Sequence, residues 1–358
     1  MNMSSRAVPA YDLRLLRGVA TLGVLFIHST GGRCFDYANV AEYVLRVLNF
    51  FPRFSLPLFV LISGYSLASA YGTRGNLGRF YQRRAQAILP PYLAFSSFAL
   101  LFKYSCVWRG TPRAAAEFSP SSLLNTLLNG SAFYHLWFLS TLVVLYAMFP
   151  LFRHLLSRCS GLAAGQRLLL VWLALQVAWS FLQAALGEPP ILGNVVPHIL
   201  NVLIIQGLYF YAGMHLAVHQ GYYRRLATEV SPWLFLSLLT AMPFIYMTSC
   251  PEPGFDTPLR TLQLACGAML LLRWLPILER PGRFNTFLDY CAANSFALYL
   301  VHPLVLDGFV RLLAFRGLNA HTPALVLPTL LTTLGLTLLA VAILRTLPGR
   351  RYLIGHDR

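Results

Sequence analysis

The chain has 358 residues, of which 57% are hydrophobic and only 11% charged. A soluble domain of this composition would leave too much apolar surface exposed, so the composition indicates an integral membrane protein. The net charge of +16 comes almost wholly from arginines in small groups between apolar runs, a pattern that argues against a nucleic-acid partner and is typical of membrane proteins with basic cytoplasmic segments.

Apolar runs separated by polar or Gly/Pro-containing breaks predict about ten transmembrane helices. The expected fold class is therefore all-α, a polytopic membrane protein with one membrane domain over residues 1–358 and no separate soluble domain. Segments containing "PPY", "QGLYFYAG" and "DYCAANS" suit kinked or partly polar helices. The expected spans are residues 13–31, 51–71, 87–107, 135–155, 167–187, 197–218, 231–250, 258–278, 286–310 and 322–346.

The distribution of arginines between the spans predicts the orientation of the chain. With the N-terminus in the cytoplasm, pairs such as Arg83–Arg84, Arg224–Arg225 and Arg350–Arg351 fall in inner segments. The outer segments hold far fewer cations. Because cytoplasmic loops of membrane proteins are enriched in Lys and Arg, the asymmetry predicts that both termini are cytoplasmic, as an even number of spans requires.

The first span, "RLLRGVATLGVLFIHSTGG", carries ionisable residues at both of its ends. Arg17 and His28 are eleven residues apart, so on a helix they share a face and lie about 16 Å apart along the axis. Arg14 lies about 40° from the same line. The arginines could be membrane anchors and the histidine could be satisfied by a neighbouring group, but ionisable residues within membranes are costly and often functional.

Two further histidines are expected on the same side of the membrane as His28. His135 opens the fourth span and His302 closes the ninth, and both of these ends are outer in the predicted topology. Three histidines from independent helices would then lie near one membrane face. This combination favours a reaction site over three unrelated structural histidines.

Five motifs occur in a characteristic order along the chain: "RLLRGVATLGVLFIH", "PLFVLISGYSLA", "RRAQAILPPY", "HLWFLSTLVVLYAMFP" and "SFALYLVHP". Together they resemble the acyltransferase-3 family of membrane O-acyltransferases over residues 11–303. The resemblance implies an inner-membrane enzyme that takes an acyl group, usually acetyl, from cytoplasmic acyl-CoA. It would place that group on a cell-envelope or exported carbohydrate such as an exopolysaccharide.

The family's first-helix pattern of an arginine, ten residues and an essential histidine matches Arg17 and His28. The resemblance therefore implies that His28 is the catalytic base or, alternatively, an acyl carrier. The family usually has an arginine three residues before the first proline of "PPY", where this chain has Ala87. Guanidinium groups suit the phosphates of acetyl-CoA, and the arginines expected to bind this donor are Arg14, Arg17, Arg83 and Arg84.

The acceptor is expected to be a carbohydrate, either free or lipid-linked, and the other partner is membrane lipid; the oligomeric state is left open. The residues expected to bind this substrate are His135, Trp137, Tyr299 and His302. The alternative is that they serve only in packing or at the membrane interface. Asp307 either orients a histidine or ends its helix in water. Ligand geometry cannot be derived across separate helices and no HxxxH-type pair supports a metal site built on His28, His135 and His302, so no metal is predicted. The alternative functions are a carbohydrate transporter or flippase and, less favoured, a metal-binding protein.

Overall fold

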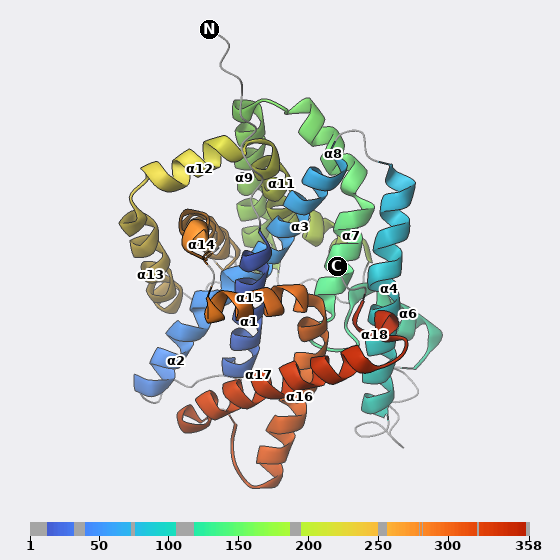
Figure 1. The fold of residues 1–358 in the computed structure, drawn as a ribbon. Coiled ribbons are helices and arrows are strands. Elements are labelled where there is room, and N and C mark those ends of the chain that lie inside the picture. Colours follow the sequence, from blue (N-terminus) through green and yellow to red (C-terminus); the bar gives the residue numbers. More distant parts are fainter. Residues whose placement is uncertain are drawn as a thin grey trace.

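The computed structural model describes residues 13–31, 40–72, 76–104, 118–186, 195–249, 256–278, 280, 282–320 and 322–355. Every regular element in these ranges is a helix, which confirms the all-α prediction. The elements, labelled as in Figure 1, are α1 (Arg14–Thr30), α2 (Val40–Phe50), a 3-10 turn (Phe51–Phe54), α3 (Ser55–Tyr71), α4 (Leu77–Lys103), α6 (Pro120–Asn129), α7 (Trp137–Ala147), α8 (Phe149–Arg158), α9 (Leu162–Leu186), α10 (Val195–Asn201), a π-helical segment (Val202–Gln206), α11 (Gly207–Val218), α12 (Gln220–Glu229), α13 (Pro232–Ser249), α14 (Asp256–Leu278), α15 (Arg283–Ala293), α16 (Ser295–Phe315), α17 (Pro323–Thr346) and α18 (Arg350–Ile354).

The described helices confirm a polytopic membrane protein, although the predicted number of spans is only approximate. Six helical stretches are long and apolar enough to cross a bilayer, and the number rises to eight if two bent helix pairs each count as one span. One of the six joins α2, the 3-10 turn and α3 into a single run, Val40–Tyr71. The predicted span ends at residues 105–107, 187 and 250 lie outside the described residues.

Two predicted spans are each divided into two helices. The span predicted at 135–155 is α7 followed by α8, with a bend of 52° between them; Pro150 lies in the first turn of α8, a position that proline tolerates because the first helical N–H groups lack partners. The span predicted at 286–310 is α15 followed by α16, with a break at Asn294. The Asn294 side-chain amide donates to the Tyr290 carbonyl at 2.8 Å. A local side-chain bond of this kind competes with helix continuation.

The search for long apolar runs did not predict the short helices α2, α6 and α12, or the early start of α4. Helix α4 begins at Leu77, ten residues before the predicted span, because the Asn76 side chain caps it by accepting from the Arg79 backbone N–H at 3.0 Å. Helix α6 is similarly capped by Ser119. Short amphipathic helices with polar caps contain no run of 20 apolar residues, which explains why the search for such runs passed over them.

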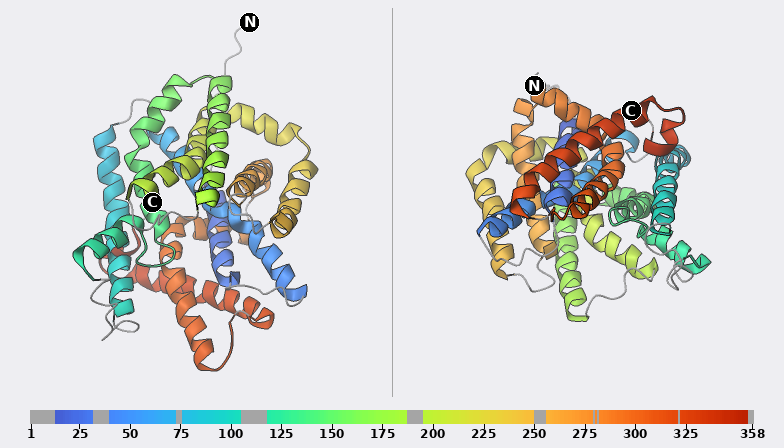
Figure 2. Two further views of the ribbon diagram at one scale, coloured as in Figure 1. Left: turned by 180° about the vertical axis from the view of Figure 1, so that it is seen from behind. Right: turned by 90° about the horizontal axis from the view of Figure 1, so that it is seen from below.

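Helix α1 lies in the middle of the packing and contacts α3, α15, α16 and α17. Helix α17 lies across α1 and α16, as Figures 1 and 2 both show. A close approach to α15 depends on Gly18, where an added Cβ would lie 2.4 Å from the Leu288 carbonyl oxygen. Because of this central position, the two ends of α1 contribute side chains to two different parts of the protein interior.

A second close crossing joins α3 to α11 and fixes the "SGY" motif. An added Cβ at Gly64 would lie 2.0 Å from the Phe210 carbonyl oxygen, and one at Gly213 would lie 1.9 Å from the Leu61 carbonyl oxygen. Small residues at such crossings let two membrane helices pack backbone to backbone. Gly64 is thus a packing residue that holds its neighbour, Ser63, against the interior cavity described below.

Candidate active site

The structure brings together the three histidines that the sequence singled out. The ring centroid of His28 on α1 lies 5.3 Å from that of His302 on α16. The His135 ring, in the turn before α7, lies 5.9 Å from His302. His135 and His302 are 2% and 0% exposed, whereas His28 is half-buried, so His28 is the member of this histidine cluster that a substrate can reach most directly.

Hydrogen bonding leaves imidazole nitrogens of this cluster available. The His302 Nδ1 lies 3.0 Å from the Leu298 carbonyl one turn earlier on α16. If Nδ1 donates this bond, Nε2 of a neutral ring is the acceptor. The buried Nε2 of His302 and both ring nitrogens of His135 make no hydrogen bond within the part of the chain that the structure describes. Buried polar atoms without partners are uncommon in folded proteins and point to a functional site.

Tyr299, on α16, contacts both His135 and His302. Its hydroxyl donates to the His135 carbonyl, and its ring lies 5.2 Å from the ring of His135 and 6.2 Å from that of His302. Trp137, also expected near the acceptor, is 38% exposed at the start of α7, and its ring contacts Phe138 at 6.2 Å. Tyr299 therefore contacts two of the three histidines directly. Trp137 follows His135 by two residues in the chain, and its ring contacts Phe138.

An interior cavity of about 550 Å³ adjoins the histidine cluster. Four arginines line it: Arg14 and Arg17 from α1, Arg84 from α4, and Arg345 from α17. The wall also includes Phe138 and Tyr299. Tyr299 belongs both to this arginine-lined cavity and to the histidine cluster, so the two parts of the site are contiguous.

The cavity wall is strongly cationic. Its charged groups are the four arginines and Asp289, so four positive charges less one negative give a net charge of +3. Asp289 accepts from Arg14 Nε at 3.1 Å, and both of these side chains are partly exposed. The charged end of the cavity therefore reaches the protein surface, where an anionic substrate can enter.

Arg84 brings a guanidinium group to the same cavity as Ala87, the residue that stands where the family usually has an arginine. Ala87 itself lines the cavity, and Arg84 lies one helical turn earlier and lines the same space. The Arg84 guanidinium lies 5.4 Å from the Tyr146 ring centroid, a cation–π arrangement that holds it in place. Arg83, the other arginine expected in the donor site, is exposed and is not among the residues that line the cavity.

Sequence reasoning missed Arg345 and Tyr134. Arg345 reaches the cavity only because α17 packs against α1, and no spacing in the sequence indicates that packing. The Tyr134 ring lies 5.3 Å from that of His28 and is 49% exposed. Its position directly before His135 was the one available signal.

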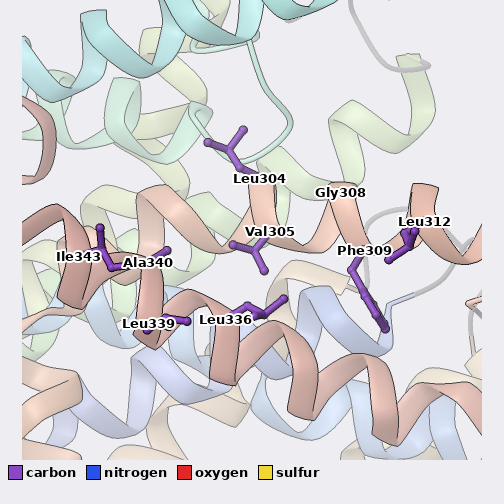
Figure 3. A pocket seen from close by; sticks show the side chains of 9 residues that line it. All are labelled: Leu304, Val305, Gly308, Phe309, Leu312, Leu336, Leu339, Ala340 and Ile343. Carbon is purple, nitrogen blue, oxygen red and sulfur yellow. The ribbon is translucent and has the colours of Figure 1, made fainter.

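A second hollow, of about 460 Å³, lies between α16 and α17 and has no groups for acid–base chemistry (Figure 3). Both helices are long and apolar enough to span a membrane, and every side chain that lines the groove is apolar. Within the described residues, no group of three or more His, Cys, Asp or Glu side chains is arranged to hold a metal ion. The groove is lined by Leu304, Val305, Gly308, Phe309, Leu312, Leu336, Leu339, Ala340 and Ile343.

Comparison with known proteins identifies the family. The family model of the acyltransferase-3 domain, described as an acyltransferase domain, matches residues 10–344, which is nearly the whole chain. Neither the curated proteins nor the solved structures gave a match. With its membrane-spanning helices and this match, the protein belongs to the acyltransferase-3 family of membrane acyltransferases.

Proposed function

We propose that the protein transfers an acetyl group from acetyl-CoA to a sugar hydroxyl of an exported or lipid-linked polysaccharide. The observation that carries this proposal is the contiguity of the two halves of the site. The arginine-lined cavity suits a phosphate-bearing donor, and through Tyr299 it adjoins three histidines suited to proton transfer.

The donor fits the charge and shape of the cavity. Coenzyme A carries several phosphates, and Arg guanidinium groups bind phosphate through two parallel hydrogen bonds. The thioester lies at the far end of a long pantetheine arm. A donor whose phosphates bind at the arginines can therefore present its acetyl group toward Tyr299 and the histidines, about 16 Å farther along α1 if the arm follows the direction from Arg17 to His28.

His28 is the proposed general base. Its imidazole removes the proton from the sugar hydroxyl while the hydroxyl oxygen attacks the thioester carbonyl, and the carbon–sulfur bond breaks as CoA leaves. The proton then passes to the departing thiolate, so the sugar ester, CoA–SH and neutral histidine are the products. The alternative order, in which His28 first takes the acetyl group and then gives it to the sugar, has the same overall balance.

The orientation in the membrane is part of the proposal: an inner-membrane protein with both termini cytoplasmic and the histidine cluster toward the outer face. Cysteine labelling tests it. Gly130, in the predicted outer loop, is unsuitable, because its φ is +68° and an added Cβ would lie 2.6 Å from the Leu136 oxygen. In a cysteine-free background, Ser121→Cys should react with an impermeant maleimide from outside and Thr228→Cys only after permeabilisation. The reverse pattern would refute the orientation.

Labelled acetyl-CoA tests the function itself. The purified protein in nanodiscs is incubated with acetyl-labelled acetyl-CoA and a lipid-linked oligosaccharide extract, and label in the carbohydrate fraction is measured beside a heat-inactivated sample. Transfer that requires the native protein is the expected result. If acetyl-CoA neither binds nor turns over with the extract present, the transferase proposal fails, and a carbohydrate transporter or flippase becomes the function to test.

A further inference from the structure

Tyr134 is the exposed residue of the aromatic group around His28. Its ring contacts the His28 ring at 5.3 Å, the same separation as between His28 and His302. It also packs at 5.0 Å on the ring of Phe133 and at 5.6 Å on that of His135. The turn between α6 and α7 thus holds Tyr134 directly against the proposed base, with 49% of the side chain exposed.

Asp307 lies on α16 five residues after His302, whose ring is 5.3 Å from that of His28. Partial burial of the Tyr134 side chain, and in addition the negative charge of Asp307 on α16, raises the pKa of the Tyr134 hydroxyl, which therefore stays protonated as a hydrogen-bond donor. Asp307 Oδ2 accepts from Arg311 Nε at 2.8 Å, and both side chains are partly exposed. A carboxylate offers about four acceptor positions and this ion pair uses one, so Asp307 can also accept from a ligand.

Tyr134 and Asp307 lie outside the wall of the arginine-lined cavity, which reaches the histidine cluster through Tyr299. Two substrates that react at one base need separate approaches. The donor's approach is cationic, whereas this second approach offers an aromatic face, a phenol donor and a carboxylate acceptor. Such a set suits a polyhydroxylated ligand, since an aromatic ring can pack on a sugar face while polar groups fix its hydroxyls.

We propose that Tyr134 and Asp307 bind the acceptor sugar and hold its reacting hydroxyl at His28. This inference rests on the proposed function and deepens it by giving the acceptor a binding site distinct from that of the donor. Tyr134 packs on the sugar ring and donates from its hydroxyl, and Asp307 accepts from a neighbouring sugar hydroxyl. The site makes the carbohydrate enter from the side of α16 and the α6–α7 turn.

Steady-state kinetics of Tyr134→Ala, Tyr134→Phe and Asp307→Asn test the inference in nanodiscs. Acetyl-CoA and the lipid-linked oligosaccharide extract are each titrated at saturating levels of the other. Tyr134→Ala should raise the extract concentration for half-maximal transfer about 10-fold or more, since it loses both the packing and the hydrogen bond. Tyr134→Phe, which keeps the ring, and Asp307→Asn should each raise it by a smaller factor of about 2–10. The KM for acetyl-CoA should stay within about 2-fold of the wild-type value in all three, because none of these side chains lines the donor cavity.

Tyr222→Ala is the matched control, because Tyr222 on α12 is 38% exposed and its ring meets that of the neighbouring Tyr223 edge to face. It should leave both titrations unchanged. The proposed acceptor site would be wrong if folded Tyr134→Ala and Asp307→Asn needed the same extract concentration for half-maximal transfer as the wild-type protein. It would also be wrong if the KM for acetyl-CoA rose by the same factor as that extract concentration. Absence of transfer by the wild-type protein would instead remove the proposed function, and this inference with it.

Discussion

The His28→Ala variant is expected to lose acyl transfer by a factor of about 10²–10⁴, the usual contribution of a positioned general base. The side chain is half-buried at the end of α1, in contact with the rings of Tyr134 and His302. Alanine favours helix, so the backbone of α1 should be unaffected. The measurement is the initial rate of label transfer from acetyl-CoA to the oligosaccharide extract, with both substrates saturating.

His154→Ala is the control for this substitution, because His154 lies exposed on α8. It should transfer at the wild-type rate. Size-exclusion profiles and helical circular dichroism of the two variants should match those of the wild-type protein. A His28→Ala protein that is folded and fully active would refute the proposed role of His28.

The same variant separates the two chemical orders. If His28 carries the acetyl group, wild-type protein incubated with labelled acetyl-CoA and no acceptor should retain label on a histidine, and His28→Ala should not. If His28 is only a base, neither protein retains label. The loss of transfer in His28→Ala shows that His28 takes part in the reaction, and the retention of label decides whether it acts as an acyl carrier or as a base.

The Arg17→Ala variant is expected to raise the KM for acetyl-CoA about 10- to 100-fold, with a smaller change in kcat. Arg17 lines the cavity from α1, and a hydrogen bond to a charged group contributes about 1.5–3 kcal/mol, which corresponds to about one to two powers of ten in affinity. Removing an interaction made with the remote phosphates weakens the bound donor and its transition state together. Arg345→Ala should act in the same direction, because Arg345 reaches the same cavity from α17.

Arg79→Ala provides the comparison, since Arg79 is an exposed arginine near the start of α4. Its KM for acetyl-CoA should equal that of the wild-type protein. Direct binding of acetyl-CoA, measured by calorimetry in nanodiscs, should weaken in Arg17→Ala by the same factor as the KM rises. Unchanged donor affinity in both Arg17→Ala and Arg345→Ala would place the donor outside this cavity.

The sequence alone determined the features that depend on local periodicity. Apolar runs of bilayer length predicted an all-α membrane protein, because every backbone group in lipid must be hydrogen-bonded within its own helix. The spacing of Arg17 and His28 predicted that one helix carries cations at one end and an imidazole at the other, and α1 is a single helix from Arg14 to Thr30. The ordered motifs also indicated the family that the match over residues 10–344 shows.

Only the tertiary structure decided which side chains from different helices meet. Arg345 lines the cavity because α17 lies across α1, and Tyr134 meets His28 because the α6–α7 turn folds over the end of α1. The division of two predicted spans likewise depended on a proline and an asparagine side chain rather than on hydropathy. Hydropathy and helical spacing describe one segment at a time, whereas the site is assembled by packing between segments far apart in the chain, which no local pattern encodes.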